Sequence, residues 1–106
     1  MIRKPLEKEV QHAILAYLEA TRTFHYRNNS GAYKAEHGSF VRYGTPGSPD
    51  IVCVIRGHYV GLEVKRPGGK LSPDQKQFAK ELTAHGGYYF LVTSIDDVIK
   101  AIHSIP

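Results

Sequence analysis

Hydrophobic residues recur at helical spacing near the start of the chain. Over residues 6–21 the apolar positions fall on one side of an α-helix. Pro5 precedes this stretch and suits the first turn of a helix. The pattern predicts a helix over residues 6–21 that packs one face against a core. The positions on that face are Leu6, Val10, Ala13, Ile14, Tyr17 and Leu18.

The middle of the chain alternates apolar runs with glycine and proline. Residues 24–27 and 40–43 each predict a short strand. The segment between them, residues 28–39, is polar and contains glycine, and so predicts a loop. Residues 44–49 (GTPGSP) enforce an irregular approach to Asp50. Two longer apolar strands then follow before residue 65.

The last third of the chain predicts a helix, a strand and a second helix. Ser72 suits an N-cap, with proline directly after it and Gln75 at the third helical position, and this helix runs to about His85. Gly86-Gly87 ends the helix before a strand over residues 88–92. Residues 94–97 then cap a final helix that runs through Ile102. The order predicts an α/β fold, with a mixed sheet and helices packed on it.

The two long strands are predicted to form a hairpin that gathers charge on one face. Gly57 and His58 suit a two-residue type II′ turn, which places Asp50 opposite Lys65. Because side chains alternate between faces, Asp50, Glu63 and Lys65 share one face, where we expect them to be exposed. The other face is wholly apolar and is predicted to be the core side. It carries Ile51, Cys53, Ile55, Val60, Leu62 and Val64.

Two interpretations of the charged cluster are open. It could be a cross-strand ion pair between Asp50 and Lys65 on a solvated face, worth at most about 1 kcal/mol. Asp50 and Glu63, however, are like charges on neighbouring strands, and their repulsion calls for a cation. Two carboxylates and a backbone carbonyl make a suitable oxygen site for Mg²⁺ or Mn²⁺. Gly61 on the same face leaves room nearby.

Composition narrows the class of protein. With 106 residues we expect one domain, residues 1–106, and the net charge of +4 leans toward a polyanionic partner such as nucleic acid. Cys53 is the only cysteine, which rules out an intrachain disulfide and predicts a buried, unreactive side chain. The six histidines are scattered, which disfavours a histidine-built metal site. Without a signal-peptide or membrane-spanning run, a soluble, cytoplasmic protein is expected.

The charged cluster carries a resemblance to a nuclease family. GSPD at residues 47–50, followed by EVK at 63–65, looks like the PD-(D/E)xK nuclease superfamily. The segments EKEVQHAILAYL, YRNNSGAY and LEVKRPGGKLSPDQ resemble the VRR-NUC family along nearly the whole chain. The resemblance implies a restriction-endonuclease-like core, with a central mixed sheet flanked by helices in the order α-β-β-β-α-β-α.

The resemblance also assigns roles to individual residues. Asp50, Glu63 and the Val64 carbonyl would bind Mg²⁺, with Mn²⁺ as a substitute, and Lys65 would lie beside the attacking water. The superfamily often adds a glutamate from the first helix, held through water. Glu7 is chosen over Glu9, because it falls on the sheet-facing side of the helix and precedes a glutamine by four residues.

Further residues complete the expected site. Gln75 has two open interpretations: a catalytic glutamine close to the site, or only the capping residue that reaches back to Ser72. Phosphate-backbone contacts are expected from residues in loops and at strand ends. These DNA-binding candidates are Arg27, Asn29, Lys34, Arg42, Arg66 and Lys70.

The resemblance predicts a metal-dependent endodeoxyribonuclease that hydrolyses phosphodiester bonds. Stand-alone VRR-NUC domains resemble Holliday-junction resolvases of recombination and DNA repair, which implies a homodimer that cuts branched DNA in a bacterial or phage-infected cell. A flap or single-strand nuclease of the same family is one alternative. The other is a catalytically silent DNA-binding module, although such a module has no need of carboxylates near phosphates.

Overall fold

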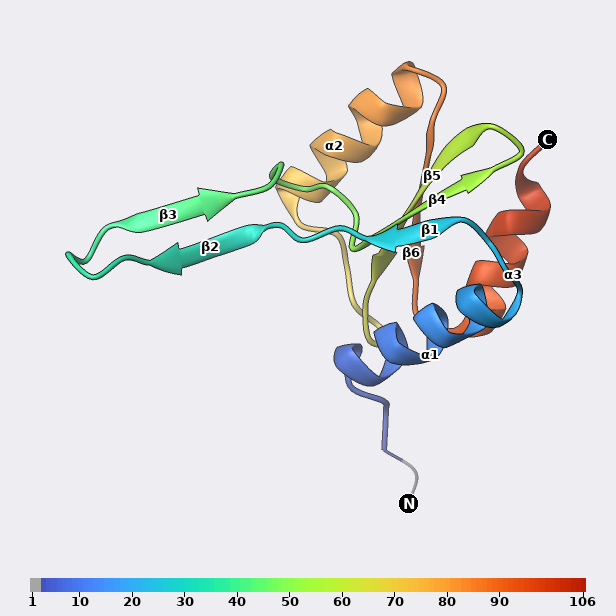
Figure 1. Cartoon of the computed structure of the whole chain (residues 1–106), viewed down its shortest axis with the longest axis horizontal. Coiled ribbons are helices and arrows are strands. Elements are labelled where there is room, and N and C mark those ends of the chain that lie inside the picture. Colours follow the sequence, from blue (N-terminus) through green and yellow to red (C-terminus); the bar gives the residue numbers. More distant parts are fainter. Residues whose placement is uncertain (1–2) are drawn as a thin grey trace.

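A computed structural model describes residues 3–106, which form a central four-stranded sheet with helices on both faces (Figure 1). The strand order is β1 (His25–Arg27), β4 (Ile51–Ile55), β5 (His58–Val64) and β6 (Tyr88–Val92). The β1–β4 and β4–β5 pairs are antiparallel, and β5–β6 is parallel. The sheet is therefore mixed, as predicted.

Two helices cover the apolar face of the sheet. α1 (Glu7–Ala20) and α3 (Ile95–Ser104) contact each other and bury their apolar stripes against β5 and β6. α2 (Pro73–Ala84) lies on the opposite face, where the ring of Phe78 contacts that of Tyr89 in β6. Cys53 is buried in the core, as expected, and burial raises the pKa of its thiol to about 11.

The β4–β5 hairpin confirms the predicted faces but not the predicted turn. Arg56 and Gly57 are the central turn residues, both with positive φ (48° and 83°), which is the type I′ geometry. The register therefore differs by two from the predicted one, and Ile51 lies opposite Leu62. A shift of two preserves the alternation of side chains, so all six apolar residues assigned to the core side are buried.

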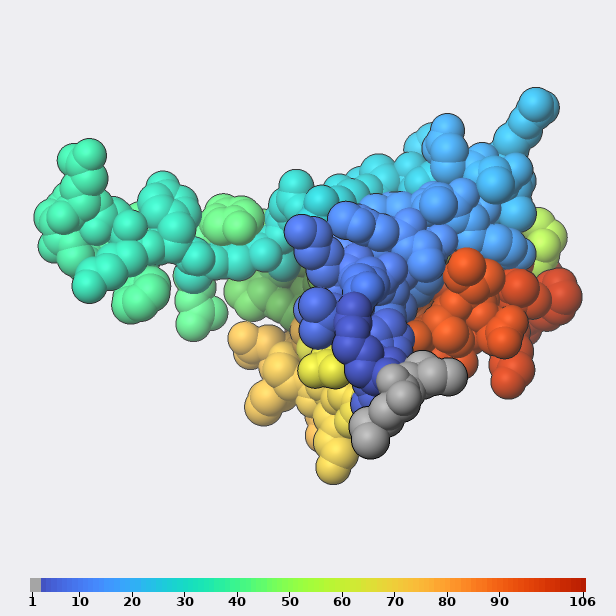
Figure 2. All heavy atoms as spheres, turned by 90° about the horizontal axis from the view of Figure 1, so that it is seen from below, coloured from blue at the N-terminus to red at the C-terminus, as the bar shows by residue number. Residues whose placement is uncertain are grey.

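A second, smaller sheet lies outside the core. β2 (Gly31–Lys34) pairs antiparallel with β3 (Phe40–Tyr43), and every residue of both strands is exposed. The prediction of a loop over residues 28–39 was wrong for β2, because a strand exposed on both faces shows no hydrophobic alternation. We call residues 31–43 the arm. It projects from the body of the protein (Figures 1 and 2).

Without the arm, the core elements follow the order α1-β1-β4-β5-α2-β6-α3. This is the α-β-β-β-α-β-α order implied by the family resemblance, and it confirms the restriction-endonuclease-like core. The helix boundaries agree closely with the predictions, and the last helix extends two residues beyond Ile102, to Ser104. Within residues 3–106, every helix is too short or too polar to span a membrane.

Candidate active site

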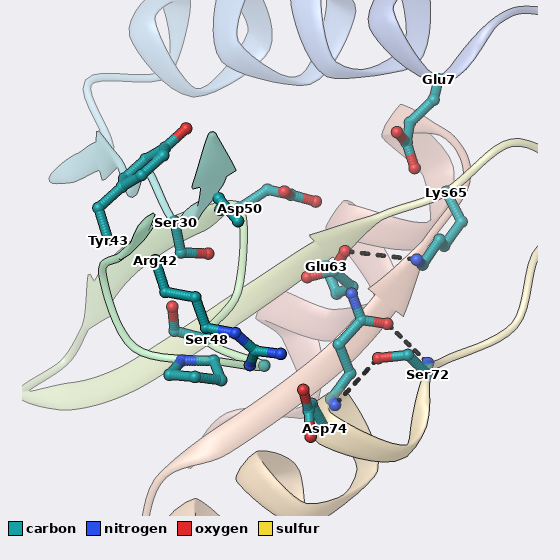
Figure 3. Close-up of a pocket in the computed structure, with 15 residues that line it drawn as sticks. Glu7, Ser30, Arg42, Tyr43, Ser48, Asp50, Glu63, Lys65, Ser72 and Asp74 are labelled. Carbon is teal, nitrogen blue, oxygen red and sulfur yellow. Dashed lines mark hydrogen bonds and ion pairs between the residues drawn. The ribbon is translucent and has the colours of Figure 1, made fainter. Parts of the chain in front are cut away.

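An open cavity of about 440 Å³ lies where α1, the base of the arm, the end of β5 and the start of α2 meet. Asp50, Glu63, Lys65 and Glu7 line it (Figure 3). Gln75 lines it as well. The structure thus brings together all five residues that the sequence analysis singled out as catalytic candidates. They come from segments spread over about two thirds of the chain.

Packing and hydrogen bonds hold the two residues that precede Asp50 in place. Pro49 is fully buried and packs on Gly61, where an added Cβ would lie only 2.6 Å from the proline Cγ. The Asn28 amide donates hydrogen bonds to Ser48 Oγ and to the Pro49 carbonyl, each at 2.9 Å. The room that Gly61 leaves is therefore filled by Pro49, and this contact helps to set the position of Asp50.

Glu63 is buried, with 3% of its surface exposed, which corrects the expectation that the three charges would all be exposed. Tyr89 and the loop at Gly47 cover it: the Tyr89 hydroxyl lies 3.1 Å from the Gly47 carbonyl and 3.4 Å from Glu63 Oε1. Burial, together with the charge of Asp50, raises the pKa of Glu63 to about 8. Without a cation, the pair of carboxylates therefore retains a proton near neutral pH.

Lys65 approaches Glu63 rather than Asp50. Its Nζ lies 3.7 Å from Glu63 Oε2, whereas Asp50 Oδ2 accepts a 2.8 Å hydrogen bond from the Val64 backbone N–H. The cross-strand ion pair between Asp50 and Lys65, one of the two open interpretations, is thus not formed; Lys65 instead pairs with Glu63, two residues before it. The difference follows from the two-residue register shift, which brings Asp50 toward Glu63.

The two glutamates at the start of α1 have different surroundings. Glu7 lines the cavity, and its carboxylate points toward Lys65 (Figure 3). Glu9 lies away from the cavity: it accepts a 2.8 Å hydrogen bond from the Leu6 N–H and pairs with Arg3 at 2.8 Å. The hydrogen bond from Arg3 is the main cause that lowers the pKa of Glu9 to about 2. Glu9 therefore caps the helix, and Glu7 is left to face the cavity.

Gln75 caps its helix and also lines the cavity. Its Oε1 accepts a 2.8 Å hydrogen bond from the Ser72 N–H, and its own N–H donates to Ser72 Oγ at 3.2 Å, which completes the predicted capping box. The same side chain lines the cavity. Because the cap occupies Oε1, the amide NH₂ is the end that can donate to a group in the cavity.

The DNA-binding candidates are distributed unevenly around the cavity. Arg42 lines it, and Arg66 and Lys70 line an adjoining groove that also includes Glu7 and Lys65. Lys34 lies on the arm. Arg27 and Asn29 line neither the cavity nor this groove.

Comparison with known protein families matches the VRR-NUC domain over residues 7–96. The chain belongs to the VRR-NUC family. This family is part of the PD-(D/E)xK nuclease superfamily, so the domain implies a nuclease, a hydrolase with DNA as its substrate. No curated protein and no solved structure matches the chain.

PD-(D/E)xK nucleases usually use divalent metals, and the donors in this VRR-NUC domain fit such an ion. Asp50 and Glu63 offer hard oxygen ligands, and the pKa of Glu63 is raised first by burial of its carboxylate and then by the negative charge of Asp50, which a bound cation would offset. No group of three or more acidic, histidine or cysteine side chains gathers within residues 3–106. The remaining ligands would therefore be the Val64 carbonyl, water and substrate phosphate.

The structure adds two residues that the sequence analysis did not single out as part of this VRR-NUC site. Asn28, rather than the neighbouring Asn29, fastens the loop that carries Asp50. Tyr89 covers Glu63 from the adjacent strand. Asn28 directly follows the strand predicted over residues 24–27, and this position gave no indication of the bond. The contact of Tyr89 depends on the parallel β5–β6 register, which the sequence does not display.

Proposed function

We propose that this VRR-NUC domain is a Mg²⁺-dependent endodeoxyribonuclease, with Mn²⁺ as a substitute, that hydrolyses phosphodiester bonds in branched DNA. One observation carries the proposal: the carboxylates of Asp50 and Glu63 and the ammonium of Lys65 meet in one open cavity. Two carboxylates this close together, one of them buried, cannot both be ionised at low cost unless a cation lies between them. A metal and a phosphate together satisfy all three groups.

Each residue has a role that follows from its place in the cavity. Asp50 and Glu63 would hold the metal, which when bound polarises the scissile phosphate and lowers the pKa of a water ligand. Lys65 places a compact positive charge where negative charge develops on the phosphate. Glu7, on the far side of Lys65, is suited to orient a water molecule by accepting a hydrogen bond from it.

A homodimer that resolves four-way junctions is the finer form of the proposal. It is supported by the similarity between stand-alone VRR-NUC domains and junction resolvases, which must cut two strands symmetrically. A flap or single-strand nuclease would use the same catalytic groups and differ only in how the DNA is held. The substrate is therefore tested separately from the chemistry.

The test compares labelled four-way junction, flap, single-stranded and duplex DNA, each with Mg²⁺, Mn²⁺ or EDTA. We expect metal-dependent, symmetric cuts in the junction that disappear in Lys65→Ala and Asp50→Asn. Lys100→Ala on α3, an exposed lysine across the sheet from the cavity, is the matched control and should cut like the wild type. Binding without cleavage in any metal would support the silent module instead.

Glu7 and Glu9 give a second test of the assignment. Glu7→Gln should lower cleavage about tenfold or more and leave stability unchanged, because the side chain is exposed and faces the cavity. Glu9→Gln should leave cleavage near the wild-type rate and lower the melting temperature, since it weakens the cap and the Arg3 pair. Equal losses of cleavage in the two variants would contradict the role given to Glu7.

A further inference from the structure

The arm exposes large apolar side chains that the fold leaves uncovered. Phe40 is 75% exposed, Tyr33 55% and Tyr43 48%. A two-stranded hairpin alone in water is only marginally stable, so such a surface is expected to gain a partner. The arm is nonetheless continuous with the active site, because Gly31, Ala32, Arg42 and Tyr43 all line the cavity.

The two faces of the arm differ in chemistry. In the observed register Lys34 lies opposite Phe40 and Ala32 opposite Arg42, and alternation places these four side chains on one face. Tyr33, Val41 and Tyr43 occupy the other face, where the rings of Tyr33 and Tyr43 lie 6.3 Å apart. Both faces reach the cavity at the base of the arm, where Tyr43 lines it from the second face, but only the first face brings a cation there, since Arg42 points toward the cavity (Figure 3).

The composition of the Lys34–Arg42 face favours nucleic acid over protein as its partner. Protein interfaces are depleted of lysine, whereas phosphate contacts rely on lysine and arginine. Within residues 3–106, neither Lys34 nor Arg42 forms an ion pair with an acidic side chain. DNA whose scissile phosphate occupies the cavity would extend along this basic face, because Arg42 belongs to both surfaces.

We propose that the arm holds the DNA strand next to the cleavage point and stacks Phe40 on an unpaired or unstacked base. This rests on the proposed nuclease function and names the feature of the substrate that the site selects. Phe40 lies two strand residues beyond Arg42, about 7 Å along the arm. At 3.4 Å per nucleotide, the stacked base is about two nucleotides from the phosphate beside Arg42. Stacking on an exposed aromatic ring requires an open π-face, which a branch point or bulge supplies and a continuous duplex does not.

The test measures DNA binding in EDTA, so that it does not depend on cleavage. Fluorescence anisotropy would compare a duplex that contains a two-nucleotide bulge with the same duplex fully paired. Phe40→Ser should weaken binding to the bulged duplex about tenfold and leave binding to the paired duplex nearly unchanged. Lys34→Gln should weaken binding to both duplexes and make the affinity less dependent on salt concentration, as loss of a phosphate contact does.

Tyr33→Ser is the matched control, because it removes another largely exposed aromatic ring, 55% exposed, from the opposite face of the same arm. It should leave binding to both duplexes at the wild-type level. An equal loss in Tyr33→Ser, or a loss in Phe40→Ser that is the same for both duplexes, would overturn the proposal. So would sedimentation data in which Phe40→Ser converts a dimer to a monomer with unchanged DNA affinity per protomer.

The arm proposal and the proposed nuclease reaction can fail independently of each other in these tests. If the wild type cleaves none of the substrates but Phe40→Ser still loses affinity for the bulge, the arm proposal stands and the proposed reaction fails. If cleavage is metal-dependent and Phe40→Ser binds the bulge like the wild type, the reaction stands and the arm proposal fails.

Discussion

The protein contains two antiparallel hairpins that share a hydrogen-bonding pattern and differ in everything that surrounds it. The β4–β5 hairpin has α1 and α3 against one face, while Pro49 and Tyr89 pack on the other. The β2–β3 arm has no such cover on either face within residues 3–106. A ladder of backbone bonds contributes little net stability by itself, so packing makes the first hairpin rigid. The proposed catalytic residues Asp50, Glu63 and Lys65 lie in or directly beside the covered hairpin, and the proposed substrate contacts lie on the other.

The largest expected difference between the hairpins is in the cleavage rate. It should appear when one lysine at each hairpin is replaced by arginine. Lys65→Arg should lower the single-turnover cleavage rate about 100-fold or more, because a planar guanidinium cannot take the place of a compact ammonium beside Glu63. Lys34→Arg on the arm should stay within about threefold of the wild type, since either cation can contact a phosphate. Comparable losses in both variants would mean that Lys65 acts only as a positive charge.

A valine-to-alanine substitution should lower the free energy of unfolding much more in the β4–β5 hairpin than in the arm. Val60 in β5 is fully buried, and Val60→Ala should lower the free energy of unfolding by about 2–3 kcal/mol. Val41 on the arm is 37% exposed, and Val41→Ala should change it by less than about 0.5 kcal/mol. Urea denaturation monitored by circular dichroism measures both. A large effect of Val41→Ala would show that the arm packs against another surface in solution.

The pH dependence of stability should be governed by the rigid hairpin. In EDTA, folded Glu63 keeps a proton up to about pH 8, whereas in the unfolded chain it loses that proton near 4.5. Its stabilising contribution is therefore fully present below about pH 4.5 and is lost as pH rises through about 8. Melting temperatures over this range should show the decline in the wild type, and Glu63→Gln should flatten it. Glu36→Gln, at the exposed turn of the arm, should retain the wild-type profile.

The smallest expected effect is at the point where the arm joins the body. Asn28→Ala removes two hydrogen bonds and should lower the free energy of unfolding by about 1–2 kcal/mol, with a parallel drop in cleavage as the Asp50 loop loosens. Asn29→Ala should change neither quantity measurably. Thermal denaturation and cleavage of a single substrate distinguish the two variants, and an effect confined to Asn29→Ala would contradict the fastening role of Asn28.

The sequence predicted the covered hairpin far better than the arm, for physical reasons. Alternation has a period of two, so the apolar face of β4 and β5 was correct even though the register was wrong by two. Arg56-Gly57 and Gly57-His58 were both acceptable turns, and only the structure shows which one forms. Burial of Glu63 was missed because it depends on Tyr89 and the loop at Gly47, which reach it from other segments. β2 was missed because neither of its faces is buried.

The bond between Asn28 and Ser48 has a consequence for how this fold can vary. It joins the two points at which the chain leaves the core for the arm and returns from it, so the ends of the excursion are held together whatever lies between them. For a segment with fixed ends, doubling its length adds only about 0.6 kcal/mol of closure entropy. The arm could therefore be shortened, lengthened or exchanged for a segment with different specificity, while the chain delivered Asp50 to the same place.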